Sequence, residues 1–180
     1  MELEQYFYQV SSVLQKLPLE DIAAVVRILE RAREEGKRVF LFGNGGSAAT
    51  ASHFACDLGK GTVREDRPRF KVIVLNDNVP TLTAYANDVG YEVVFAEPLA
   101  SLGEPGDVVI GISGSGNSPN VLRAMDVARQ RGMTTIGITG YQGGKLKERV
   151  DVCVVVPSDS MQQIEDVHLV ILHAVFLALC

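Results

Sequence analysis

The sequence predicts an α/β fold, a doubly wound five-stranded parallel sheet flanked by helices. Three observations predict it. Short apolar runs of strand type alternate with helical periodicity from residue 38 onward. Two of these runs end directly in Ser/Gly-rich loops that open helices, at 43–47 and 113–118. No linker or shift of composition divides the 180 residues, so we expect one domain, 1–180.

Two amphipathic helices come first in the chain. Apolar residues recur every three and four positions up to Pro18, and again from Ile22 until Gly36. This helical prefix, residues 1–36, adds apolar faces that a partner subunit is expected to cover.

The rest of the chain alternates between the two patterns. Strands are expected at 38–42, 70–75, 108–112, 134–139 and 152–156. Helices are expected at 47–58, 80–86, 91–102, 119–129 and 161–179, the fourth beginning with Pro119 in its first turn and the second interrupted by Asn87-Asp88.

The last helix is apolar nearly all round over residues 167–179. Thirteen such residues are too few to cross a bilayer, which needs about 20. A soluble helix of this kind must be buried on most sides. One small sheet covers one face, so we expect another subunit to cover the rest.

The composition excludes several classes of protein. A hydrophobic fraction of 47% excludes disorder, and a net charge of −5 without a basic block favours neither nucleic acid nor a membrane as partner. Cys56, Cys153 and Cys180 lack metal-type spacing and are expected to be buried free thiols. The N-terminus has no basic and apolar leader pattern, so a cytoplasmic location is expected.

The loop at 43–47, Gly-Asn-Gly-Gly-Ser, is the first candidate binding element. Glycines let the backbone approach a ligand closely, and the amides and positive dipole end of the next helix favour an anion. Ser47 is the expected N-cap of that helix. No lysine and no third glycine follow at the spacings that nucleotide P-loops and dinucleotide-binding loops require. The predicted phosphate cradle consists of Asn44, Gly45, Gly46 and Ser47.

The loop at 113–118, Ser-Gly-Ser-Gly-Asn-Ser, is the second candidate binding element. Either loop alone could be glycine-rich only for its geometry, but two at the carboxyl ends of strands in one sheet favour a shared ligand crevice. Neither contains Lys or Arg, which favours a small sugar phosphate over a triphosphate with its metal. The binding residues expected here are Ser113, Gly114, Ser115 and Ser118.

Acids and histidines follow on two helices. His53 and Asp57 are four residues apart and share a helix face. On the last helix, Glu165 and His173 are separated by eight residues, about 12 Å of rise. A lone histidine in an apolar helix is more often a hydrogen-bonded core residue, so spacing alone leaves both interpretations open.

Taken jointly, these residues resemble the SIS (sugar isomerase) domain family, most closely its phosphoheptose (sedoheptulose 7-phosphate) isomerase branch. The resemblance covers essentially the whole chain. It depends on the two Ser/Gly loops, His53-Phe54-Ala55, Arg67-Pro68, Asn87-Asp88, Gly106-Asp107, Thr139-Gly140, His168 and His173. It implies a homotetramer with active sites between subunits, which converts sedoheptulose 7-phosphate to D-glycero-D-manno-heptose 7-phosphate.

The resemblance also implies roles for individual residues. Family phosphate binders map onto Ser47, Ser113, Ser115 and Ser118, and an acid that binds a substrate hydroxyl maps onto Asp88. The family's general base is a glutamate where Asp57 stands, and its acid histidine maps onto His173. Some members bind zinc, and the corresponding ligands here are His53, Asp57, Glu165 and His173.

Three departures accompany the resemblance. Gly114 replaces a threonine, Asp57 a longer glutamate, and Glu165 a glutamine. The implied mechanism is abstraction of a proton next to the carbonyl by Asp57, an enediol intermediate, and reprotonation assisted by His173. Residues from different chains at a subunit interface would resolve the 12 Å separation of Glu165 and His173.

Two alternatives stay open. Some relatives are regulators, including a tetrameric partner of the bacterial replication initiator, and these differ in the catalytic acids and histidines. Retention of His53, an acid at 57 and His173 favours an enzyme. Among enzymes, an aldose–ketose isomerase for a pentose or hexose phosphate is the second candidate.

Overall fold

A computed structural model describes residues 3–180, and its core is a five-stranded, all-parallel sheet in the order β2-β1-β3-β4-β5. The strands are β1 (Arg38–Gly43), β2 (Lys71–Val74), β3 (Val108–Ser113), β4 (Thr134–Thr139) and β5 (Val152–Val155). The helices are α1 (Leu3–Leu14), α2 (Leu19–Glu34), α3 (Gly46–Cys56), η1 (Asp57–Gly61), α4 (Val79–Asp88), η2 (Tyr91–Val93), α5 (Ala96–Leu102), α6 (Pro119–Gln130), η3 (Gly144–Arg149) and α7 (Met161–Leu179).

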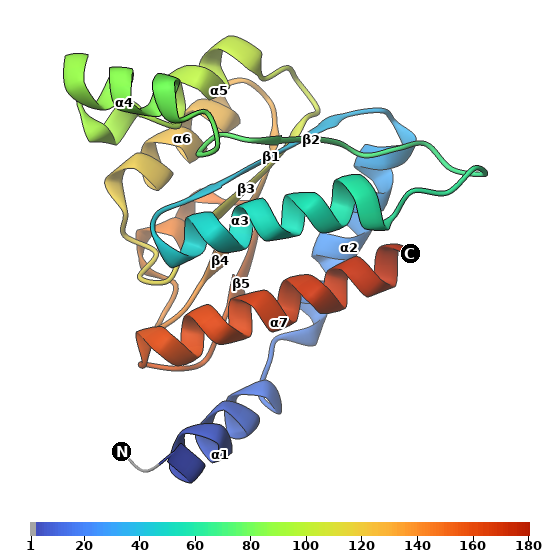
Figure 1. Cartoon of the computed structure of the whole chain (residues 1–180), viewed down its shortest axis with the longest axis vertical. Helices are drawn as coiled ribbons and strands as arrows, with labels where there is room; N and C mark the ends of the chain where they lie inside the picture. Colours follow the sequence, from blue (N-terminus) through green and yellow to red (C-terminus); the bar gives the residue numbers. More distant parts are fainter. Residues whose placement is uncertain (1–2) are drawn as a thin grey trace.

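Alternation along the central strands explains why helices cover both faces. Val39 and Leu41 of β1 pack into one buried cluster with residues of α2, α3 and α7. Phe40 and Phe42 point the other way, into a second cluster with residues of α5 and α6. A strand buried on both faces must be apolar throughout, as in a parallel sheet. The predicted doubly wound fold is therefore confirmed (Figure 1).

The strand order places the two Ser/Gly loops side by side. From β1 the chain runs through α3 to β2 on one side, whereas from β3 it runs through α6 to β4 on the other. β1 and β3 are neighbours, with Gly43 opposite Ile112. The carboxyl ends of these strands form the switch point where open α/β sheets bind ligands.

Helices α3 and α7 lie side by side on one face of the sheet (Figure 1). A glycine in η1 permits the contact at one end, because a Cβ on Gly61 would lie 2.6 Å from the ring of Phe176 in α7. Arg33 of α2, only 4% exposed, donates to the Leu179 carbonyl at 3.0 Å and fixes the end of α7.

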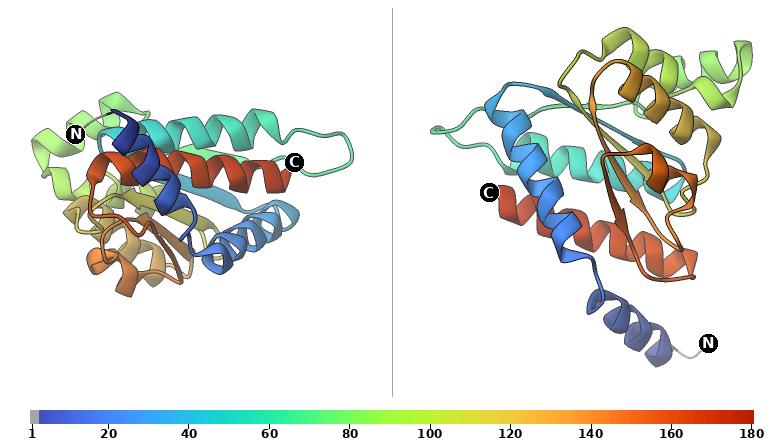
Figure 2. Two further views of the ribbon diagram at one scale, coloured as in Figure 1. Left: turned by 90° about the horizontal axis from the view of Figure 1, so that it is seen from below. Right: turned by 180° about the vertical axis from the view of Figure 1, so that it is seen from behind.

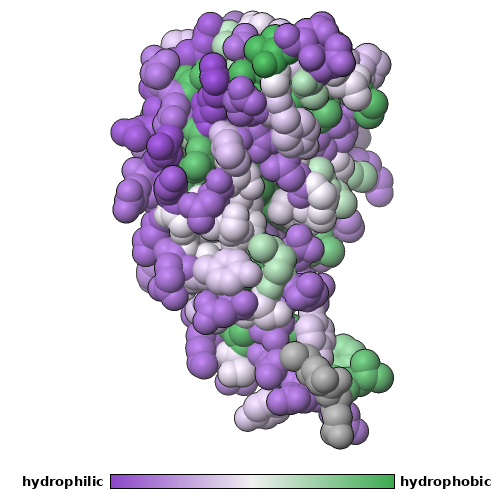
Figure 3. Space-filling view, turned by 90° about the vertical axis from the view of Figure 1, so that its left-hand side faces the viewer, coloured by the Kyte–Doolittle hydropathy of each residue, from purple (hydrophilic) through white to green (hydrophobic). Residues whose placement is uncertain are grey.

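Helix α1 projects from the body of the protein (Figures 1 and 2). It is attached to α7 by a hydrogen bond from the Tyr6 hydroxyl to the Asp166 carboxylate and by another from Gln163 to Gln9 at 2.8 Å. Leu3, Phe7 and Tyr8 are 80%, 69% and 78% exposed. Apolar side chains are visible at this end of the molecule in Figure 3.

Several local expectations were wrong. Ser47 is not the N-cap, since α3 begins at Gly46 and Gly45 takes the cap position with a φ of 54°. Asn87 and Asp88 end α4 rather than interrupt it, and the single helix expected at 91–102 is divided into η2 and α5. The helix expected over 47–58 changes at Asp57 into the wider π-helical turn η1.

Helix α7 is only partly covered within one chain. Among the helices of residues 3–180, it alone has a length and composition that would allow a membrane span. However, 44% of its most apolar 18-residue stretch is buried against the rest of the protein. A core helix passes the same test, so this is weak evidence for a membrane. Val170 and Leu177 are 44% and 69% exposed on it.

The cysteines are free thiols, as expected, but none of the three is fully buried. Cys56 is exposed, and Cys153 and Cys180 are partly exposed. Burial raises the pKa of Cys153 to about 11, because desolvation disfavours the thiolate.

Candidate active site

The two Ser/Gly loops enclose a small polar cavity at the switch point. Its volume is about 140 Å³. Ser47 and Ser113 are 5% and 4% exposed. The lining residues are Asn44, Ser47, Ile112, Ser113, Gly114, Ser115, Ser118, Met161 and Glu165. A pocket of hydroxyls at the start of a helix suits a phosphate group.

Backbone contacts make glycine necessary in the first loop. A Cβ on Gly43 would lie 2.8 Å from the Ser47 backbone and 2.9 Å from the Ile112 carbonyl, so only glycine lets β1 approach α3 and β3 this closely. Gly45 has a φ of 54°, a conformation that favours glycine. The Ser47 and Ala48 N–H groups donate to the Asn44 and Gly45 carbonyls, each at 3.0 Å, which holds the loop against the start of α3.

The second loop is held by the loop that follows β4. The Gly116 N–H donates to the Ser113 carbonyl at 2.9 Å, and the Ser113 and Ser118 hydroxyls are hydrogen-bonded at 3.0 Å. The Gly140 N–H donates to the Gly114 carbonyl at 2.9 Å. Gly116 has a φ of 64°.

Glu165 brings a carboxylate to this cavity. A Cβ on Gly46 would lie 2.7 Å from Glu165 Oε2, so the carboxylate packs directly on the first residue of α3. Negative charge is favourable at a helix N-terminus. Met161 lies one turn earlier on α7 and fills the space beside Gly114, where a Cβ would lie 2.5 Å from Met161 Sδ.

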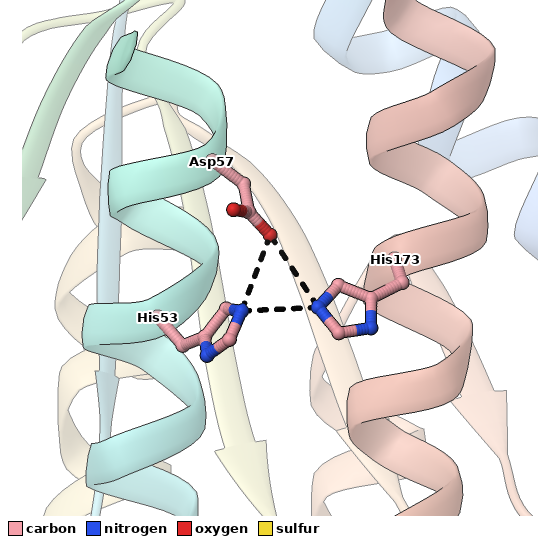
Figure 4. A group of neighbouring side chains, drawn as sticks. All are labelled: His53, Asp57 and His173. Carbon is pink, nitrogen blue, oxygen red and sulfur yellow. Dashed lines mark hydrogen bonds and ion pairs between the residues drawn. The ribbon is translucent and has the colours of Figure 1, made fainter. Parts of the chain in front are cut away.

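A second group of side chains gathers farther along α3 and α7 (Figure 4). His53 Nε2 and His173 Nε2 are 3.0 Å apart. Asp57 Oδ2 lies 3.6 Å from His53 Nε2 and 3.7 Å from His173 Nε2. The π-helical turn begins at Asp57. Such turns recur at functional sites.

Asp57 Oδ2 is buried and accepts no hydrogen bond from residues 3–180. A buried carboxylate oxygen without a donor is costly, and a bound cation would satisfy it. Two ligands of a tetrahedral zinc ion, each about 2.0–2.1 Å from the metal, lie about 3.3 Å apart. The three separations observed fit a metal centre built from His53, Asp57 and His173.

This group forms within one chain. An interface between subunits was one expected way to bring Glu165 and His173 to a single point. The structure instead places Glu165 at the phosphate-sized cavity and His173 with His53 and Asp57, so neighbouring helices of one chain supply both.

The remaining predicted residue lies outside the cavity lining, and two residues that were not predicted contact Asn44. Asp88 lies at the exposed end of α4 and accepts a hydrogen bond from Asn87 at 2.7 Å, outside the cavity lining. Asn120 and Tyr91 hydrogen-bond to Asn44, although sequence reasoning did not select them. Asn120 follows Pro119 directly, but nothing in the sequence indicates a bond across 76 residues.

His168 lies apart from both groups. It is 1% exposed, and neither ring nitrogen has a hydrogen-bond partner within residues 3–180. Desolvation lowers the pKa of His168 to about 4, although the nearby Thr139 backbone opposes this. His168 is thus a neutral core residue.

Fold and site together define a sugar-isomerase-type domain, and the chain belongs to the SIS domain family, whose model matches residues 5–140. Within that family it belongs with the phosphoheptose isomerases. The protein of that name from Roseiflexus sp. (strain RS-1) is 46% identical over 154 residues, 86% of this chain and 77% of the relative. The one from Akkermansia muciniphila is 41% identical over 155 residues, 86% of this chain and 82% of the relative.

A solved structure agrees with this assignment. A phosphoheptose isomerase from Francisella tularensis superposes with a TM-score of 0.92 at 31% sequence identity, covering 98% of this chain and 95% of that one. The family fold expected from the sequence is therefore confirmed.

Proposed function

We propose that this protein is an aldose–ketose isomerase that converts sedoheptulose 7-phosphate to D-glycero-D-manno-heptose 7-phosphate. The observation that carries the proposal is the arrangement of two sites along α3 and α7. A phosphate-sized cavity lies at the start of α3, and a carboxylate with two imidazoles lies farther along the same pair of helices. The names of the relatives support the same activity.

The separation of the two sites favours a long sugar. Ser47 and His53 are six residues apart on α3, about 9 Å of helical rise. An extended chain of single bonds advances about 1.2 Å per bond, as in an extended polypeptide, so C2 and the phosphorus of a heptulose 7-phosphate are about 8 Å apart. The same atoms of a pentulose 5-phosphate are about 6 Å apart. The longer substrate spans the two sites better.

The side chains supply the proton transfers that isomerisation needs. Asp57 takes the proton from C1 of the ketose, the electron pair forms the C1=C2 double bond, and O2 gains a proton from His173 to give the enediol. Return of a proton to C2 and loss of the O1 proton give the aldose. Proton transfer by a positioned side chain contributes typically about 10²–10⁴-fold in rate.

Zinc is the metal that we propose for this centre. His53, Asp57 and His173 would hold it, and a bound zinc ion polarises a carbonyl oxygen and stabilises negative charge on it. Glu165, the fourth predicted ligand, lies at the phosphate cavity in this conformation. We propose that it contacts the substrate there, and that Asp88 binds a substrate hydroxyl.

The substrate proposal is tested by comparing ketose phosphates of five, six and seven carbons. We expect kcat/KM to be highest for sedoheptulose 7-phosphate, because that chain spans the two sites better than the shorter ones. Equal or higher kcat/KM for a pentulose 5-phosphate would contradict the length argument and favour another sugar-phosphate isomerase. Thermal stabilisation by sugar phosphates without turnover of any would favour a regulator.

We also propose that the protein is a cytoplasmic homotetramer. The exposed apolar residues of α1 and α7 support self-association. The three free thiols support a reducing compartment.

A further inference from the structure

A polar network joins the two Ser/Gly loops. The amides of Asn44 in the first loop and Asn120 in α6 exchange two hydrogen bonds, each 2.9 Å long. The Tyr91 hydroxyl, from η2, donates to Asn44 Oδ1 at 3.0 Å. Three segments distant in sequence therefore meet at the side chain of Asn44.

The backbone fixes which end of the Asn120 amide donates and which end accepts. The Val121 backbone N–H donates to Asn120 Oδ1 at 3.0 Å. A backbone N–H can only donate, so the oxygen of Asn120 must face it. This orients Asn120, which is 2% exposed, with its Nδ2 toward Asn44 Oδ1.

Asn44 is oriented in turn. Its Nδ2 donates to Asn120 Oδ1, while its Oδ1 accepts from both Asn120 and Tyr91. A reversed Asn44 amide would set its nitrogen against the Asn120 Nδ2 donor and its oxygen against the Asn120 Oδ1 acceptor. The bonds of the neighbouring residues therefore exclude that rotamer.

One hydrogen of the oriented amide stays available. An amide nitrogen carries two N–H donors, and the bond to Asn120 uses one of the two on Asn44. Asn44 lines the cavity together with Ser47 and Ser113. A fixed N–H suits the oxygen of a phosphate, whereas an amide free to rotate would present its own oxygen, which repels the ligand, about as readily.

We infer that Asn120 and Tyr91 are positioning residues, which hold the Asn44 amide as a donor toward the phosphate group of the substrate. The inference rests on the proposed function for the identity of that substrate. It concerns the phosphate end of the site, far from the proton-transfer residues, and so predicts an effect on binding rather than on chemistry.

Binding of inorganic phosphate, measured by calorimetry or by the concentration dependence of the melting temperature, tests the inference without turnover. We expect Tyr91→Phe, which removes one hydroxyl from a half-exposed side chain, to weaken phosphate binding about two- to fivefold. Asn120→Leu, which removes the orienting amide, should weaken it about tenfold. Tyr8→Phe, on exposed α1, is the matched control and should leave binding unchanged.

The decisive comparison repeats Tyr91→Phe in an Asn44→Ala background. Because Tyr91 acts through Asn44, its substitution should have no further effect there. A persisting loss would overturn the inference and show that Tyr91 touches the ligand itself, from the adjoining cavity that it lines with Glu92 and Ser118. Undiminished binding in Tyr91→Phe alone would also overturn it.

Kinetics separate this inference from the proposed function. With sedoheptulose 7-phosphate, Tyr91→Phe should raise KM by the same factor and leave kcat unchanged, whereas a loss of folded protein would lower kcat at constant KM. Wild-type protein that binds phosphate without turnover would contradict the proposed function. The phosphate-binding comparison would still decide the role of Tyr91.

Discussion

Asp57 is the residue on which the proposed chemistry depends. Its Oδ2 is buried between two imidazoles, 3.6 Å from His53 Nε2 and 3.7 Å from His173 Nε2, and lies with this group rather than at the phosphate cavity. Asp57→Asn keeps the shape and removes the base. We expect turnover to fall by about 10²–10⁴-fold, with inorganic phosphate binding unchanged.

The control for this prediction is Asp66→Asn on the exposed connection after η1, which should retain full activity. Full activity of Asp57→Asn would show that another group takes the proton. Loss of phosphate binding in Asp57→Asn would show that the two sites are not independent.

Gly114 and Gly116 of the second loop form a matched pair, because alanine at the two positions should lower the free energy of unfolding by different amounts. A Cβ on Gly116 would lie 2.1 Å from the Gly143 carbonyl, and φ is 64° there. A Cβ on Gly114 would come close only to Met161, a flexible side chain, and would make an ordinary contact with Ile164 at 3.7 Å. We expect Gly116→Ala to lower the free energy of unfolding by about 2 kcal/mol or more, and Gly114→Ala by less than about 1 kcal/mol. Urea denaturation measures both, and equal losses would contradict this account.

At the residue scale, sequence spacing predicted part of the site. The serines of both loops lie at the cavity, and His53 and Asp57 share a helix face as four-residue spacing requires. The orientation of Asn44 by Asn120 and Tyr91 could not be predicted, because it depends on how three separate segments pack.

At the scale of single elements, the boundaries were harder to predict than the elements. The five strands lie where β-branched runs predicted them. The change of α3 into η1 at Asp57 was missed, because the wider turn depends on tertiary contacts such as that of Gly61 with Phe176 on α7. That turn also sets where Asp57 stands relative to His173.

His168 on α7 makes the free energy of unfolding depend on pH. The pKa of His168 is about 4 in the folded protein and near 6.5 when unfolded, so the unfolded chain takes up the proton first. Stability from the neutral ring is fully present above about pH 6.5 and is lost as pH falls toward 4, by about 3 kcal/mol in all.

His168→Leu removes this dependence. In urea denaturation between pH 7 and 4, the variant should gain about 3 kcal/mol relative to wild type. Val167→Ala, at a buried position of the same helix without a titratable group, is the control and should change stability by the same amount at every pH. A difference between wild type and His168→Leu that is the same at every pH would contradict the assignment of His168 as a neutral core residue.

At the scale of the whole molecule, the sequence predicted a doubly wound parallel sheet, but neither its strand order nor the place where the site is completed. The loops after β1 and β3 meet because the strand order reverses there. The packing of α7 against α3 then brings His173 to His53 within one chain. An apolar pattern shows that α7 is buried, but not which helix it packs against.

Assembly is the prediction that belongs to this scale. Leu3, Phe7 and Tyr8 expose an apolar face on the projecting α1, with Val170 and Leu177 exposed on α7. We expect a tetramer by sedimentation or light scattering, and a smaller species for Phe7→Glu, because a buried charge without a partner is costly. A monomeric wild-type protein would contradict the proposed assembly, and Glu4→Gln is the charge control on the same helix.

The measurement that tests the central claim most directly is NMR of sedoheptulose 7-phosphate incubated with the purified protein, first untreated, then after chelation, then with zinc restored. We expect aldoheptose 7-phosphate signals to grow, to cease on chelation and to return with zinc, since the isomerase and its metal centre use the same three side chains. Turnover that chelation does not change would contradict the zinc centre. Absence of aldose in all three samples, while inorganic phosphate still binds, would contradict the isomerase.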